Sequence, residues 1–112
     1  QMNNTDFVAA YQKANGKLPD EDVAITFALC QGIDQAVNAT GSVDNDKIIA
    51  WLHGRTASDP VNTILGTYNW DETGLPINKQ PLIVQWQGGE LKFIYPINEF
   101  KASPAISPKP AW

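Results

Sequence analysis

The sequence contains too few residues of certain types to support several classes of function. It has one cysteine, Cys30, and one histidine, His53, which excludes an internal disulfide and leaves too few soft ligands for a structural zinc site. Its 8 lysines and arginines against 12 aspartates and glutamates give a net charge of −4, so no basic surface is available for the phosphates of a nucleic acid. No apolar run approaches the roughly 20 residues that cross a bilayer, and the first residues do not have the pattern of a signal peptide. We therefore expect no metal, no nucleic-acid partner and no secretion signal within these residues.

The first half of the sequence has helical periodicity with clear start and stop signals. Side chains that can cap a helix occupy residues 3–6, and Gly16 follows where a left-handed residue ends a helix at little cost. A second helix begins near Asp20, and its apolar stripe is wide enough for a buried helix. Ser42 or Asp44 caps a shorter third helix. The predicted helices span residues 4–15, 20–38 and 44–53.

From Pro60 onward the pattern favours strands. Polar and apolar residues alternate before a turn cluster at residues 71–74, and a dense apolar strand then leads to a tight turn at residues 87–89. Pro96 ends the returning strand, and residues 96–112 are predicted to be an extended tail that lies along its own surface. The fold class is therefore mixed α/β, with three helices followed by a strand-hairpin region. The predicted strands span residues 62–69, 81–87 and 90–95.

Several apolar positions are predicted to form the core. Cys30, on the apolar stripe of the second helix, is predicted to be a small core residue, while His53 favours the negative end of the third helix dipole. These two residues lie on different helices without a nucleophile elbow, so we do not expect them to act as a nucleophile and base. The side chains whose truncation should be most damaging are Phe27, Ile33, Trp51 and Trp86.

The cluster Trp70, Asp71 and Glu72 admits two interpretations. An aromatic ring beside two carboxylates is found where sugars bind and where acid and base catalysis occurs. Adjacent carboxylates in a turn diverge, however, and Gly74 can supply the positive φ that a structural turn needs. We therefore favour a structural hairpin and predict no catalytic residue and no cofactor.

The order of these elements and of several short motifs resembles the end of type I periplasmic solute-binding proteins of the leucine/isoleucine/valine-binding family. The resemblance covers about Asp6 to Pro96. It implies a C-terminal fragment of a two-lobed protein in which each lobe is an α/β sandwich and the ligand lies in the cleft between the lobes. The motifs that carry the resemblance are Leu65-Gly66, Trp70-Asp71-Glu72-x-Gly74, Gln85-Trp86-x-x-Gly89-Glu90-Leu91 and Tyr95-Pro96.

The resemblance also implies how the chain is divided. About residues 1–18 would belong to the second lobe, about 19–80 to the first lobe, and about 81–95 to strands that cross the hinge, followed by the tail at 96–112.

The resemblance places one candidate ligand residue, Asp22, because the start of the corresponding helix faces the cleft in the family. Its carboxylate could accept hydrogen bonds from an amine or hydroxyl, or it could merely complement the helix dipole together with its acidic neighbours. Family members often carry an aromatic residue here, and their main ligand clamps come from loops upstream. Gln85 and Trp86 would lie near the hinge, where they could govern lobe closure, although we favour core packing for Trp86.

The function implied is that of the extracytoplasmic or periplasmic solute-binding component of an ABC importer. Such a protein captures a small polar solute, such as a branched-chain amino acid, by lobe closure and delivers it to a membrane permease. The alternative is a ligand-sensing module of a receptor or regulator with the same fold. In isolation, the chain is expected to self-associate or to remain with the missing N-terminal part.

Overall fold

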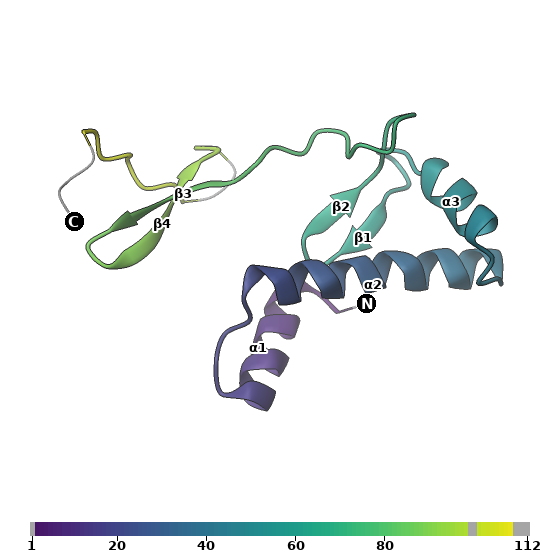
Figure 1. The fold of residues 1–112 in the computed structure, drawn as a ribbon, viewed down its shortest axis with the longest axis horizontal. Coiled ribbons are helices and arrows are strands. Elements are labelled where there is room, and N and C mark those ends of the chain that lie inside the picture. The colour runs from purple at the N-terminus through teal and green to yellow at the C-terminus, as the bar shows by residue number, and fades with distance from the viewer. Residues whose placement is uncertain (1, 99–100, 109–112) are drawn as a thin grey trace. The chain divides into compact units, whose positions relative to one another are not determined.

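The computed structural model describes residues 2–98 and 101–108. The chain divides into two compact units, Gln1–Ile77 and Asn78–Trp112. The first unit contains α1, α2, α3 and the β1–β2 hairpin, and the second contains the β3–β4 hairpin (Figure 1). This order of helices followed by hairpins confirms the mixed α/β class. The helices agree closely with the predicted ones and are α1 (Asn4–Asn15), α2 (Glu21–Thr40) and α3 (Asn45–His53).

Local capping accounts for the helix ends. Asn3, Asp20 and Asp44 each precede a helix, and each side chain accepts a hydrogen bond from the N–H group three residues later, at 2.9, 3.0 and 3.1 Å. Of the two caps considered for the third helix, Asp44 is therefore the one used. Gly16 and Gly41 end α1 and α2 with φ of 70° and 63°, a conformation that glycine adopts without a Cβ clash.

The prediction of one continuous strand over residues 62–69 is wrong. A two-residue turn interrupts it, and the Thr63 hydroxyl accepts a hydrogen bond from the Leu65 N–H at 3.0 Å and donates to the Gly66 carbonyl oxygen at 2.9 Å. Gly66 has φ of 99°, which a residue with a side chain rarely adopts, so the chain reverses here. The two antiparallel strands are β1 (Val61–Thr63) and β2 (Gly66–Tyr68).

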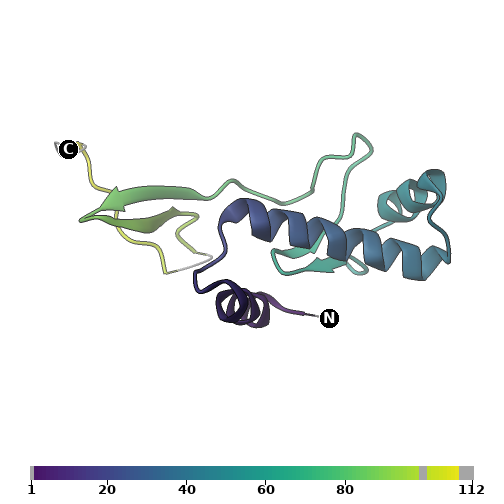
Figure 2. The same cartoon turned by 60° about the horizontal axis from the view of Figure 1, so that its bottom comes forward.

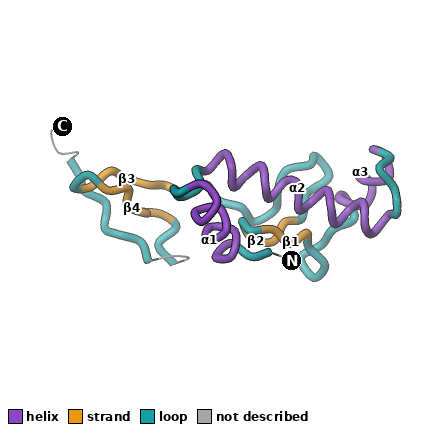
Figure 3. Tube along the Cα trace, turned by 90° about the horizontal axis from the view of Figure 1, so that it is seen from below, coloured by secondary structure: helices purple, strands orange, loops and turns teal. Residues whose placement is uncertain are grey.

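The core of the first unit lies where α1, α2 and the turn of the first hairpin meet. Phe7, Ala28 and Ile64 are buried there, one from each of these elements. The rings of Phe7 and Phe27 lie 4.7 Å apart between centroids. Figure 2 shows α1 against the N-terminal part of α2, and Figure 3 shows the first hairpin beside the same helix.

Two glutamines on α2 bind the backbone of the first hairpin. The buried Gln31 accepts a hydrogen bond from the Ile64 N–H at 2.7 Å and donates to the Met2 carbonyl oxygen at 2.9 Å. One turn later, Gln35 accepts from the Asn62 N–H at 3.0 Å and donates to the Asn62 carbonyl oxygen at 2.8 Å. The main-chain N–H and carbonyl groups on the outer edge of β1 are therefore hydrogen-bonded to side chains of α2 rather than to a third strand.

The second hairpin confirms the two predicted strands on either side of the Gly-Gly turn. Gly88 and Gly89 have φ of 60° and 80°, as a tight two-residue hairpin turn requires. Trp86 lies opposite Leu91 in the antiparallel register. The strands are β3 (Ile83–Gln87) and β4 (Glu90–Tyr95).

The predicted core is only partly correct. Phe27 and Trp51 are half-buried, but Ile33 is 45% exposed and Trp86 is 63% exposed. The second helix is not enclosed as predicted, since Ile25 and Leu29 are exposed as well. Strands of three residues cannot cover the apolar side of a 20-residue helix, so part of its stripe has no partner within this unit.

Candidate functional site

The start of α2 carries the ligand residue proposed from the sequence. Asp20 uses its side chain to cap the helix, whereas the exposed carboxylate of Asp22 makes no hydrogen bond or ion pair with the described residues. The first turn also contains Glu21, so the acidic side chains gather at the positive end of the helix dipole. Asp22 is thus free to accept hydrogen bonds, and both interpretations given for it remain predictions.

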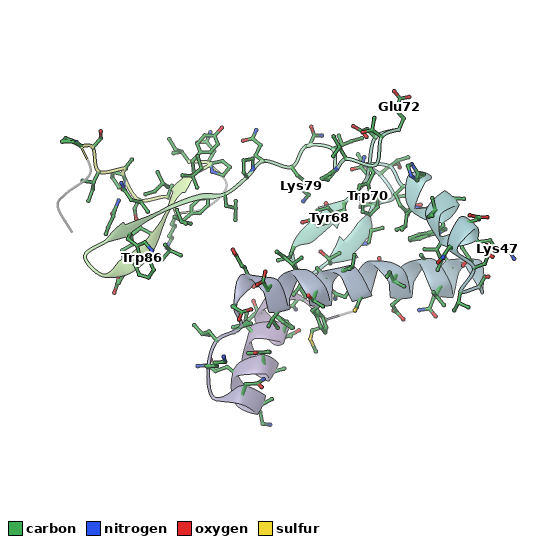
Figure 4. The ribbon with its side chains drawn as sticks, viewed as in Figure 1. Lys47, Tyr68, Trp70, Glu72, Lys79 and Trp86 are labelled. Atoms are coloured by element: carbon green, nitrogen blue, oxygen red, sulfur yellow. The ribbon has the colours of Figure 1, made fainter. Side chains whose placement is uncertain are left out.

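An apolar groove of about 260 Å³ runs between α2 and the first hairpin. Its floor on α2 is formed by Ile25, Leu29 and Ile33, which are spaced one helical turn apart. Tyr68 and Trp70 line the opposite side, where their rings stack with centroids 6.3 Å apart (Figure 4). The lining of the groove is almost entirely apolar.

The cluster at Trp70 is a structural turn, as the favoured interpretation predicted. The Asp71 Oδ1 atom accepts hydrogen bonds from the Thr73 hydroxyl at 2.6 Å and from the N–H groups of Thr73 and Leu75 at 2.8 and 3.0 Å. The hydrogen bond from the Thr73 hydroxyl, followed by that from the Leu75 N–H, lowers the pKa of Asp71 below its usual value. Gly74 has the expected positive φ of 85°. The carboxylate therefore holds the turn, and its neighbour Glu72 is exposed (Figure 4).

The single cysteine and the single histidine do not form a site. Cys30 is exposed on α2, so its prediction as a core residue is wrong; it lies outside the helix face that contacts α1 and the hairpin. His53 occupies the last turn of α3, as predicted, and is exposed. Across residues 2–98 and 101–108, no group of three or more histidine, cysteine or acidic side chains could hold a metal ion.

Trp86 and Gln85 differ from each other in their surroundings. The prediction of core packing for Trp86 is wrong, because its side chain is largely exposed on the second hairpin (Figure 4). The side chain of Gln85 instead donates to the Ile106 carbonyl oxygen and accepts from the Ile106 N–H group, each at 2.9 Å. These bonds confirm that the described part of the tail lies along its own surface. Trp112, the last residue of the predicted tail, lies outside the described residues.

The described helices include none that is long and apolar enough to cross a membrane. No protein-family model matches this chain, and no curated protein matches it either. A solved structure does match, with a TM-score of 0.64, and it defines the class. The chain is similar in fold to part of a type I periplasmic binding protein, in agreement with a place in the C-terminal part of such proteins.

The matching structure is the crystal structure of a leucine-binding protein, LivK, from Thermotoga maritima MSB8. It is 26% identical to this chain, and the match covers 83% of this chain and 25% of that one. The resemblance and fold predicted from the sequence are therefore confirmed: the chain is similar to a segment of a branched-chain amino-acid-binding protein. At the level of the fold, this similarity supports a solute-binding role, and the structural neighbour is a binding protein rather than an enzyme.

Proposed function

We propose that this chain is part of the solute-binding component of an ABC importer, located outside the cytoplasm. The whole protein would capture a small polar solute, such as a branched-chain amino acid, by closing two lobes and would deliver it to a membrane permease. The observation that carries this proposal is the match to the leucine-binding protein over 83% of the chain. No cofactor or catalytic group is needed, because capture depends on hydrogen bonds and on a shift between open and closed lobes.

The chain would contribute to both lobes of that protein. Residues 1–18 would belong to the second lobe, residues 19–80 to the first, and residues 81–95 to the strands that cross the hinge, with 96–112 as the tail. Because the chain spans 25% of the length of its structural neighbour, most of the cleft would come from residues outside it.

Asp22 would be the contribution of this chain to ligand binding. Its exposed carboxylate has no partner among the described residues and lies in the first turn of α2. A carboxylate in that position can accept charge-assisted hydrogen bonds from the ammonium group of an amino acid.

The uncovered side of α2 is in accord with a larger lobe. Ile25, Leu29 and Ile33 are 54%, 64% and 45% exposed and form a continuous apolar stripe. A stripe of this kind is expected on a helix that packs against a sheet, and the hairpin of the first unit is too short to serve as that sheet.

The proposal is tested on the complete product of the gene that encodes these residues. Titration calorimetry with leucine, isoleucine and valine should give dissociation constants in the micromolar range or tighter. Asp22→Ala should weaken binding by about tenfold, because a charge-assisted hydrogen bond is lost. Thr26→Ala, a change on an exposed residue one turn later in the same helix, should leave the affinity unchanged.

Two outcomes would contradict parts of the proposal. Absence of binding to any branched-chain or related polar amino acid would overturn the proposed solute class. Unchanged affinity in Asp22→Ala would show that this carboxylate complements the helix dipole and does not contact the ligand. Uptake of the labelled solute by cells that lack the gene separates transport from sensing: an importer component is required for uptake, whereas a receptor or regulator of the same fold is not.

A further inference from the structure

One face of the β3–β4 hairpin, which we call the polar face, carries Gln85 and Gln87 on β3. It binds an extended segment of the same chain, residues 103–106, which we call the strap. The Nε2 atom of Gln85 donates to the Ile106 carbonyl oxygen at 2.9 Å, and its Oε1 atom accepts from the Ile106 N–H at 2.9 Å. The Nε2 atom of Gln87 donates to the Pro104 carbonyl oxygen, also at 2.9 Å. Since the earlier glutamine binds the later strap residue, the strap runs antiparallel to β3.

The two glutamines form one connected network. Gln87 Nε2 also donates to Gln85 Oε1 at 2.7 Å. Gln85 Oε1 therefore accepts two hydrogen bonds, and Gln87 Nε2 donates two. Pro104 has no N–H group, and its carbonyl oxygen is the only main-chain group that it presents to the site. The network therefore recognises the main chain of the strap and uses none of its side-chain functional groups.

The same pairing occurs in the first unit between two other segments. There, the carboxamide of Gln35 accepts from the Asn62 N–H at 3.0 Å and donates to the Asn62 carbonyl oxygen at 2.8 Å. In both units a glutamine side chain thus takes the place of a neighbouring strand toward one residue of an extended segment.

Little apolar burial holds the strap in place. Pro104 and Ala105 are exposed, and Ile106 is 44% exposed. One main-chain hydrogen bond adds to the glutamine contacts, from the Ser103 N–H to the Phe93 carbonyl oxygen at 2.7 Å. Hydrogen bonds that exchange readily with water contribute little net stability, so a segment held mainly by them opens easily.

We propose that the polar face of the β3–β4 hairpin is a docking site for an uncharged, extended peptide segment, and that the strap is its built-in and displaceable occupant. The ligand must present a carbonyl oxygen at one residue and both an N–H and a carbonyl oxygen two residues later. This is main-chain recognition of the kind by which peptides add to sheet edges, with side chains supplying the bonds. The inference does not depend on the proposed transport function.

The test uses the full chain and a fluorescently labelled peptide of residues 102–108, which has no charged side chain. Ile106→Pro removes the N–H group that Gln85 binds and should open the site, whereas Ala105→Pro leaves both bound residues unchanged and serves as the matched control. We expect the peptide to bind Ile106→Pro about tenfold more tightly than the parent chain or the control, because the strap no longer competes. Adding Gln85→Ala to Ile106→Pro should abolish this binding.

Amide hydrogen exchange gives a second measurement that needs no added peptide. In Gln85→Ala, the Ile106 amide should exchange about tenfold faster, while the amides that pair β3 with β4 should keep their protection. Gln80→Ala is the control, since Gln80 bonds to the Tyr95 hydroxyl and not to the strap. Equal peptide binding by all variants, or binding that persists without Gln85 while the hairpin remains protected, would overturn the proposal.

Discussion

At the scale of single residues, Asp71 shows how one side chain holds a turn. Three hydrogen bonds converge on its Oδ1 atom, two from main-chain N–H groups and one from the Thr73 hydroxyl. We expect Asp71→Ala to loosen the turn, because both amides lose their acceptor. Hydrogen exchange at Thr73 and Leu75 should become clearly faster, and unchanged exchange at both amides would show that the turn does not need the carboxylate.

The charge of Asp71 also makes the stability of the first unit depend on pH. Its folded-state pKa lies below the usual value of an aspartate, so the unfolded chain binds the proton more readily. The stabilisation is therefore fully present above about pH 4 and is lost as the pH falls through the folded-state pKa. Urea unfolding from pH 6 to pH 2 should show this loss in the parent and less of it in Asp71→Asn, which keeps an acceptor oxygen but does not titrate.

Gln31 is the buried polar residue on which the first unit depends. Gln31→Ala leaves the Ile64 N–H and the Met2 carbonyl oxygen without their partner, and an unsatisfied buried group costs about 1–3 kcal/mol. The free energy of unfolding in urea should fall by that amount. Gln12→Ala, on the exposed side of α1, should change it by less than about 0.5 kcal/mol. Equal effects of the two changes would contradict the role of Gln31.

At the scale of elements, exposure separates the large apolar side chains into two groups. Phe27 packs on Phe7, so Phe27→Ala should destabilise the first unit by about 2–4 kcal/mol. Trp86 is 63% exposed, so Trp86→Ala should change the unfolding free energy by no more than about 0.5 kcal/mol. Chemical unfolding monitored by circular dichroism measures both changes, and a larger cost at Trp86 than at Phe27 would reverse the assignment of the core.

At the scale of the whole molecule, the apolar groove on α2 determines how the isolated chain behaves. Ile25, Leu29 and Ile33 are exposed together, and an open apolar face of this kind promotes association between copies. We expect concentration-dependent self-association in analytical ultracentrifugation and no binding of branched-chain amino acids by the isolated chain. Leu29→Lys should reduce the association, because it places a charge in the groove.

The control for this experiment adds the same charge elsewhere on the helix. Thr26 is exposed on α2 and does not line the groove, so Thr26→Lys should leave the association unchanged. A compact monomer that binds amino acids with full affinity would contradict the expectation that the chain needs further segments to complete a cleft.

The candidate site was predictable only where it depends on neighbouring residues. The turn at Asp71 was expected from the cluster that ends at Gly74, because its hydrogen bonds join residues close in sequence. Gln31 was missed, although a glutamine within an apolar stripe is a detectable signal. Its partner Ile64 is 33 residues away, and periodicity on one helix does not reveal such a partner.

Residues close in sequence specify the elements whose ends are capped locally. Asn3, Asp20 and Asp44 bond to N–H groups three residues away, and the Gly88-Gly89 turn brings adjacent strands together. Contacts with distant segments decide instead that α2 binds the outer edge of β1, and that Ile33 and Trp86 are exposed. The physical reason is that a cap depends on a few consecutive residues, whereas burial depends on which distant segments are present to cover a side chain.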